Sequence, residues 1–153
     1  MAGVKQRVLF VCVGNACRSQ MAEGFARTYG ADVMEPASAG LAPATAVPDI
    51  TREVMREKGV ELAGHFPKPL IAADLGRNHL VLNLSGAALP PAANIRDWKV
   101  DDPVGQGIYV HRRVRDEVER LVMALILELR KAQLAPPEPG AGTWKRTHPR
   151  MLR

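Results

Sequence analysis

The chain has 153 residues, a length typical of a single domain, and its 46% of hydrophobic residues is too high for a wholly disordered protein. Its net charge is +5, but residues 134–153 carry +3 of this, so the remainder is nearly balanced and does not indicate a nucleic-acid-binding protein. No apolar run is long enough for a bilayer span or a signal peptide, so we expect no membrane association. Two cysteines cannot build a disulfide scaffold, which favours a cytoplasmic protein.

The first expected element is a buried strand in the apolar, β-branched run Val8–Val13. Gly14 and Asn15 follow, and both residue types tolerate positive φ, so the chain can turn at once. A helical pattern begins at Ser19, with one apolar face formed by Met21, Ala22, Phe25, Ala26 and Tyr29. The loop Cys12–Arg18 therefore joins a strand to the amino end of a helix, where backbone N–H groups can converge on an anion.

Cys12 and Arg18 stand at the two ends of this loop, at a spacing that suits a tetrahedral oxyanion. The loop amides can face inward, the guanidinium of Arg18 can hold two oxygens, and the thiol of Cys12 then faces the central atom. The amide dipoles, the helix terminus and Arg18 all favour the thiolate, which is the nucleophilic form of cysteine. The expected substrate-binding residues are Val13, Gly14, Asn15, Ala16, Cys17 and Arg18.

The sequence Cys-Val-Gly-Asn-Ala-Cys-Arg-Ser at 12–19, followed by Met-Ala-Glu at 21–23, resembles the signature of the low-molecular-weight protein tyrosine phosphatase family. Thioredoxin-coupled arsenate reductases share this fold and loop, and the run Ser-Gln-Met-Ala-Glu-Gly is similar to their version. The resemblance implies that Cys12 is the nucleophile, that Ser19 donates a hydrogen bond to its thiolate, and that Asn15 supports the strained turn.

Two roles are open for Cys17. One is simple packing within the loop. The other, which the resemblance implies, is a reversible disulfide with Cys12 that protects the nucleophile from over-oxidation.

The remaining elements alternate between strands and helices. They are expected to be a strand at Asp32–Gly40, a helix that opens at Pro48 and ends at Gly59, a short helix at Leu70–Leu75, strands at His79–Leu84 and Asn94–Val100, and a long helix at Gln106–Lys131. Pro36 predicts that the first of these strands lies at an edge. The alternation predicts an α/β fold: a single-domain three-layer sandwich with a four-stranded parallel sheet, helices on both faces, and a phosphate-binding loop after the first strand.

The sequence Asp101-Asp102-Pro103 follows the last expected strand, at the same edge of the sheet as the Cys12 loop. Expelling a phenoxide is slow without a proton donor, so a cysteine-dependent phosphatase needs an acid at this edge. In the family that the loop resembles, the acid is an aspartate directly before a proline, which implies Asp102. Asp101 is the alternative, because adjacent residues of a turn can exchange roles.

Together these residues predict a cysteine-dependent phosphomonoesterase of the protein tyrosine phosphatase type, acting through a cysteinyl-phosphate on a phosphorylated protein or a small phosphomonoester. Arg18 and the loop amides supply the positive field, so neither a metal nor a cofactor is expected. Only 5% of the residues are aromatic, and Val-Gly-Gln-Gly follows Pro103, so few side chains are available to grip a phenyl ring.

Two alternatives remain open. The same loop would bind arsenate, but the resembled reductases carry two further cysteines after the third strand, where this chain has Ser85 and Leu89. Neither residue can exchange disulfides, so an arsenate reductase would need an external thiol reductant. The other alternative is a regulatory protein that binds phosphate or arsenate without turnover. The presence of both a nucleophile and an acid argues against it.

The helical pattern stops near Leu134, and the prolines and glycine in Pro-Pro-Glu-Pro-Gly at 136–140 cannot continue it. Basic side chains follow at Lys145, Arg146, Arg150 and Arg153. We therefore expect a phosphatase-like domain at 1–133 and a flexible basic C-terminal tail at 134–153.

Overall fold

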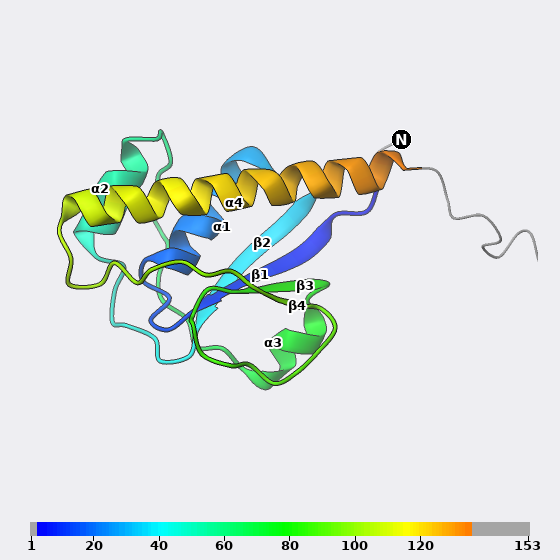
Figure 1. Cartoon of the computed structure of the whole chain (residues 1–153), viewed down its shortest axis with the longest axis horizontal. Helices are drawn as coiled ribbons and strands as arrows, with labels where there is room; N and C mark the ends of the chain where they lie inside the picture. Colours follow the sequence, from blue (N-terminus) through cyan, green and yellow to red (C-terminus); the bar gives the residue numbers. More distant parts are fainter. Residues whose placement is uncertain (1–2, 136–153) are drawn as a thin grey trace, which may run out of the picture.

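The computed structural model describes residues 3–135 (Figure 1). In chain order the elements are β1 (Gln6–Cys12), α1 (Arg18–Tyr29), β2 (Met34–Gly40), α2 (Asp49–Arg56), α3 (Ala72–Arg77), β3 (Leu80–Asn83), β4 (Ile95–Asp97) and α4 (Ile108–Leu134). The predicted tail lies outside the described residues from 136 onward. Within the described part, no helix is both long enough and apolar enough to cross a membrane.

The four strands are all parallel and lie in the order β2-β1-β3-β4, as the alternation of elements predicts. β1 is central, with Val8 between Pro36 of β2 and Leu80 of β3. β2 is the predicted edge strand, where a proline is tolerated because one side of the strand has no partner. Because β1 is central, the loop after it leaves the carboxyl edge of the sheet between the ends of β2 and β3, the usual place for a ligand.

Alternate residues of β1 divide the core into two layers. Val8 and Phe10 belong to the cluster that includes α1 and α4. Leu9 and Val11 face the opposite side, where Leu75 of α3 packs. Figure 1 shows α1 and α4 together on one side of the sheet, with α3 apart from them near β3 and β4. The predicted three-layer sandwich, with helices on both faces, is confirmed.

α4 is the longest helix, and its buried stripe recurs at helical spacing at Val114, Val118, Val122, Leu125 and Ile126. Gly30, at the end of α1, lies close against this helix, since a Cβ there would be 2.8 Å from Ile126 Cγ1. The amino end of α4 follows the Asp101–Asp102 segment. Packing of α4 on the core therefore anchors one end of the segment that carries the expected acid.

The short helix predicted at Leu70–Leu75 begins two residues later, as α3. The backbone N–H of Leu70 bonds to Gly40 O at 2.8 Å, which keeps this residue extended beside the end of β2. The helix begins after Ile71, whose backbone N–H donates to Asp74 Oδ2 at 3.0 Å. A tertiary contact and a local cap thus set the boundary.

Most other elements differ from the predicted bounds by one to three residues at an end, and two of these differences, at the ends of β4 and α4, bear on the site and on the predicted domain boundary. The strand predicted at Asn94–Val100 ends at Asp97, and Val100 O accepts a hydrogen bond from Arg18 instead of continuing the ladder. α4 continues to Leu134 rather than stopping at Lys131, so the helix crosses the predicted domain boundary after residue 133.

Candidate active site

The loop between β1 and α1 is shaped by a strained turn and by the chain that follows β2. Asn15 has φ of 49°, the only positive φ of a non-glycine residue among residues 3–135. The backbone N–H groups of Ala42 and Ala44 donate to the carbonyls of Val13 and Gly14, at 2.8 and 2.9 Å. These bonds tie the loop to the segment that follows β2.

Gly40, the last residue of β2, lies directly against the backbone of the loop. A Cβ at this position would lie 2.8 Å from both Asn15 N and Val13 O. Both atoms belong to the backbone, so a larger residue would require the loop itself to move. Glycine is required at position 40 because β2 pairs with β1 there. This requirement cannot be predicted from the sequence around Gly40.

Cys12 ends β1 and is buried, with its Sγ 2.9 Å from Ser19 Oγ. Asn15 Nδ2 donates to the same hydroxyl oxygen at 2.7 Å. Because Ser19 Oγ already accepts that bond, its proton is available to the sulfur of Cys12. The supporting roles of Ser19 and Asn15 stay predictions, for which these contacts provide the geometry.

Arg18 begins α1, and its guanidinium is held by two backbone carbonyls. Nη1 donates to Leu84 O at 2.6 Å and to Val100 O at 3.2 Å. Leu84 directly follows β3, and Val100 lies in the segment after β4, so the segments after two strands hold one nitrogen of the guanidinium. The opposite Nη2 lies 3.5 Å from Asp102 Oδ2. Neither carbonyl is identifiable from the sequence, because the partners are 66 and 82 residues away.

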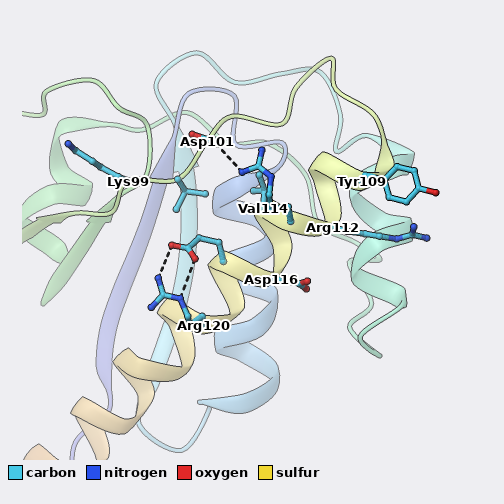
Figure 2. Close-up of a pocket in the computed structure, with 10 residues that line it drawn as sticks. Lys99, Asp101, Tyr109, Arg112, Val114, Asp116 and Arg120 are labelled. Carbon is cyan, nitrogen blue, oxygen red and sulfur yellow. Dashed lines mark hydrogen bonds and ion pairs between the residues drawn. The ribbon is translucent and has the colours of Figure 1, made fainter.

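The two adjacent aspartates point in different directions. Asp102 pairs with Arg18, and its Oδ1 accepts a hydrogen bond from Val104 N at 3.0 Å. Asp101 turns toward α4, where Arg113 Nη1 lies 3.1 Å from its Oδ2; Figure 2 shows this side chain paired with an arginine of the helix. The structure therefore places Asp102, rather than Asp101, beside the loop.

A cavity of about 200 Å³ brings the predicted residues together. Its lining consists of Cys12, Val13, Gly14, Ala16, Cys17, Arg18, Ala44, Asp102 and Val104. Asn15, predicted to bind substrate, is fully buried and does not line the cavity. Ala44 and Val104 were not predicted, because an exposed alanine or valine in a loop carries no chemical signal.

Cys17 lies in the wall of the cavity, with its sulfur accepting a hydrogen bond from Thr51 Oγ1 at 3.2 Å. Burial raises the pKa of the Cys17 thiol, and the bond from Thr51 only partly opposes this. Cys17 is therefore less reactive than an exposed cysteine. Both cysteines are free in the structure, so their disulfide stays a prediction.

A larger hollow of about 770 Å³ lies beside this site, between the segment at 99–101 and α4 (Figure 2). Among its charged lining residues, Asp101 pairs with Arg113 and Glu117 pairs with Arg120. Across residues 3–135, no three His, Cys, Asp or Glu side chains are grouped so that they could hold a metal ion.

The profile of the family described as low molecular weight phosphotyrosine protein phosphatase matches residues 7–135. The chain belongs to this family. Its known members include both phosphatases and arsenate reductases. The glutaredoxin arsenate reductase of Synechocystis sp. is 36% identical over 130 residues, which cover 81% of this chain and 98% of that protein. An arsenate reductase of Staphylococcus aureus is 34% identical, covering 75% of this chain and 92% of that protein.

Solved structures similar to this chain likewise include both a phosphatase and an arsenate reductase. An arginine phosphatase from Geobacillus stearothermophilus is 27% identical and superposes with a TM-score of 0.74, over 87% of this chain and 98% of that one. An arsenate reductase in its phosphate-binding state is 35% identical, with a TM-score of 0.72 over 81% and 98% of the two chains. The family thus establishes an enzyme fold, while the two chemistries both have relatives close to this chain.

In this family member, the turn after β3 contains no thiol. Ser85 is buried, and its Oγ donates to Asn83 Oδ1 at 2.6 Å. Leu89 packs against the apolar cluster around Val11 and Val81. Both residues have structural contacts where the resemblance places the additional cysteines of thioredoxin-coupled reductases.

Proposed function

We propose that this protein is a cysteine-dependent phosphomonoesterase that acts through a cysteinyl-phosphate. The observation that supports it most is the single small cavity lined by Cys12, Arg18 and Asp102 together. These side chains supply a nucleophile, a cation for the equatorial oxygens and a carboxyl group. A receptor that only binds an oxyanion has no need of the first and the last.

In the first step, the Cys12 thiolate attacks phosphorus, and the ester P–O bond breaks on the opposite side. Arg18 and the loop amides hold the three equatorial oxygens, where negative charge develops. Asp102 gives its proton to the leaving oxygen, so the product departs as a neutral alcohol or phenol.

In the second step, water attacks the cysteinyl-phosphate. Asp102, now a carboxylate, accepts a proton from this water, and the S–P bond breaks. Inorganic phosphate leaves, and Cys12 returns to its thiolate with Ser19 as hydrogen-bond donor. Each group ends in the state in which it started.

The rim of the cavity suggests how the leaving group is held. Val13, Ala44 and Val104 form it, and none of them is aromatic or charged. The segment at 41–46 beside them is exposed and also carries no charge. Without an aromatic side chain to stack on a phenyl ring, we expect broad and weak selectivity among small phosphomonoesters.

Arsenate reduction is the second candidate, because several of the most similar relatives are arsenate reductases. Converting As(V) to As(III) takes two electrons, which two thiols supply by joining in a disulfide. With Ser85 and Leu89 in the turn after β3, Cys12 would provide one thiol and an external molecule the other.

One set of assays distinguishes a phosphatase from an arsenate reductase. The purified protein is incubated with phenyl phosphate, and separately with arsenate plus glutathione, mycothiol or a dithiol protein, with Cys12→Ser in parallel. Release of phosphate that requires Cys12 supports the phosphatase. Arsenite formation that depends on an added thiol supports the reductase. Tight phosphate binding without either reaction would refute both.

A further inference from the structure

The hollow of about 770 Å³ between the segment at 99–101 and α4 takes part in no step of the proposed reaction (Figure 2). Val100 and Val114 are the aliphatic residues of its lining. Asp101 lines this hollow, and Asp102 lines the catalytic cavity. The two sites are therefore one residue apart along the chain, and a substrate that extends out of the cavity on this side enters the hollow.

Three cationic side chains of the hollow are accessible to a ligand. The side chains of Arg113 and Arg120 are 63% and 65% exposed. Lys99 is also exposed, and it makes no ion pair within residues 3–135. Figure 2 shows the side chain of Lys99 extending away from α4, so a ligand meets it at the other edge of the hollow from the two arginines.

The two carboxylates among these cations are already bound. Asp101 accepts a hydrogen bond from Arg113 Nη1 at 3.1 Å, and Glu117 accepts from Arg120 Nε and Nη2 at 3.2 and 2.8 Å. A guanidinium carries five N–H donors and no acceptor, so both arginines keep donors for a further partner. With Lys99, three cations face two anions, and the hollow has a surplus of positive charge and of donors.

Two further charged residues of the lining, Arg112 and Asp116, are paired outside the hollow. Arg112 Nη2 lies 2.6 Å from Glu57 Oε2, and Asp116 Oδ1 lies 2.9 Å from Arg115 Nη2. They therefore leave the surplus of positive charge in the hollow unchanged.

The rest of the surroundings of the catalytic cavity contrasts with this hollow. The rim residues Val13, Ala44 and Val104 are uncharged, and the segment at 41–46 is too. Such a rim discriminates little between small leaving groups. Selection between substrates therefore has to come from parts of the substrate that lie beyond the cavity, and the charged hollow is where they meet fixed cations.

The dimensions of the hollow suit an extended peptide. Consecutive Cα atoms are about 3.8 Å apart, so the carboxyl groups of Asp101 and Asp102 lie within roughly 10 Å of each other although they point in different directions. From Arg113 to Arg120, α4 rises by about a further 10 Å. Because an extended chain advances by about 3.3 Å per residue, residues about two to six positions from a phosphorylated residue in the cavity reach these arginines.

We propose that this hollow binds an acidic segment of a phosphoprotein substrate, with Asp or Glu side chains about two to six residues from the phosphorylated residue. Their carboxylates accept hydrogen bonds from Lys99, Arg113 and Arg120. The internal ion pairs of the hollow are exposed and weak, so they compete little with a substrate carboxylate. This inference rests on the proposed phosphatase function and names the substrate class for it.

The test compares three phosphotyrosine peptides of equal length. One carries aspartates on the amino side of the phosphotyrosine, one carries them on the carboxyl side, and the third has asparagines at all these positions. We expect one of the two acidic peptides to have a KM about fivefold to twentyfold below that of the neutral peptide, with kcat within about twofold. This advantage should disappear in about 1 M salt, because salt screens exposed charges.

Lys99→Gln and Arg120→Gln remove cations without touching the partner of Asp101. Each should raise the KM of the favoured peptide by about twofold to fivefold and leave phenyl phosphate hydrolysis unchanged. Arg96→Gln is the matched control, because Arg96 is also exposed and pairs with Glu128 at 2.7 Å, but does not line the hollow. It should leave the KM of every peptide unchanged.

Equal KM values for acidic and neutral peptides, or equal effects of Arg96→Gln and Arg120→Gln, overturn the proposal. Inhibition by a DNA oligonucleotide as strong as by an unphosphorylated acidic peptide also overturns it, because the hollow then binds any polyanion. Calorimetry of the peptides with Cys12→Ser needs no turnover. A preference there for an acidic peptide that Arg120→Gln removes supports the docking site even if no phosphate is released. Hydrolysis of phenyl phosphate without any peptide preference leaves the phosphatase in place and overturns the docking site.

Discussion

Replacing Asp102 by asparagine tests the proposed acid most directly. The change keeps the shape of the side chain and an oxygen that can accept from Val104 N, but it removes the transferable proton. A positioned general acid contributes roughly 10²–10⁴-fold to a rate. We therefore expect kcat for phenyl phosphate to fall by that factor, which corresponds to about 2.7–5.5 kcal/mol of transition-state stabilisation.

Asp101→Asn is the control for loss of charge in the same turn. Asp101 is mostly exposed and pairs with Arg113 rather than with the loop. An exposed ion pair of this kind contributes about 0–1 kcal/mol, so the rate should change by less than about fivefold. The difference between the two variants should be at least tenfold, although both remove one negative charge from adjacent positions.

The assay is kcat/KM for a series of aryl phosphates, because this ratio reports the first step, in which the leaving group departs, and not the later hydrolysis of the cysteinyl-phosphate. The two variants and the unmodified protein are measured side by side. A good leaving group such as a nitrophenoxide needs little protonation, so the deficit of Asp102→Asn should shrink as the leaving group becomes more acidic. A deficit that is the same for all leaving groups would refute the role of Asp102 as proton donor. Equal losses in the two variants would show that charge, rather than the proton, is what matters.

Three further predictions concern the nucleophile, the loop and acid stability. Cys12→Ser should lower aryl phosphate hydrolysis by more than about 10³-fold with an unchanged circular dichroism spectrum; retained hydrolysis would exclude the cysteinyl-phosphate. Gly40→Ala should reduce kcat by about tenfold or more, because its Cβ would strike the loop backbone, whereas Gly76→Ala, with open space around it, should not. Hydrogen bonds from two arginines of α4 lower the pKa of Glu57 to about 2, so its stabilising contribution is complete above the unfolded-state value of 4.5 and is lost as pH falls through about 2. Glu57→Gln should therefore flatten the decline of the urea midpoint over that pH range, and an equally steep decline would contradict this reading.

Local patterns in the sequence were enough to predict the order of the elements, and they led to the hypothesis of a cysteine nucleophile in the loop after β1. The apolar run before Cys12, the turn residues Gly14 and Asn15, and the helical pattern from Ser19 each act within a few residues, so they predict a strand, a loop and a helix. The parallel sheet follows from the alternation of elements. Element boundaries were less accurate where a distant group competes, as Gly40 does for Leu70.

The tertiary structure decided what surrounds the loop. Which aspartate faces Arg18 depends on Arg113 of α4, and the guanidinium of Arg18 depends on carbonyls after β3 and β4. His65 reaches Gln20 across 45 residues of chain. Such contacts join segments that are far apart in the sequence and that the order of strands in the sheet brings together. They produce no local sequence pattern from which they could be predicted. The sequence alone predicted that Cys12 and Arg18 lie at the two ends of a loop suited to an oxyanion, and the fold decided which groups orient their side chains.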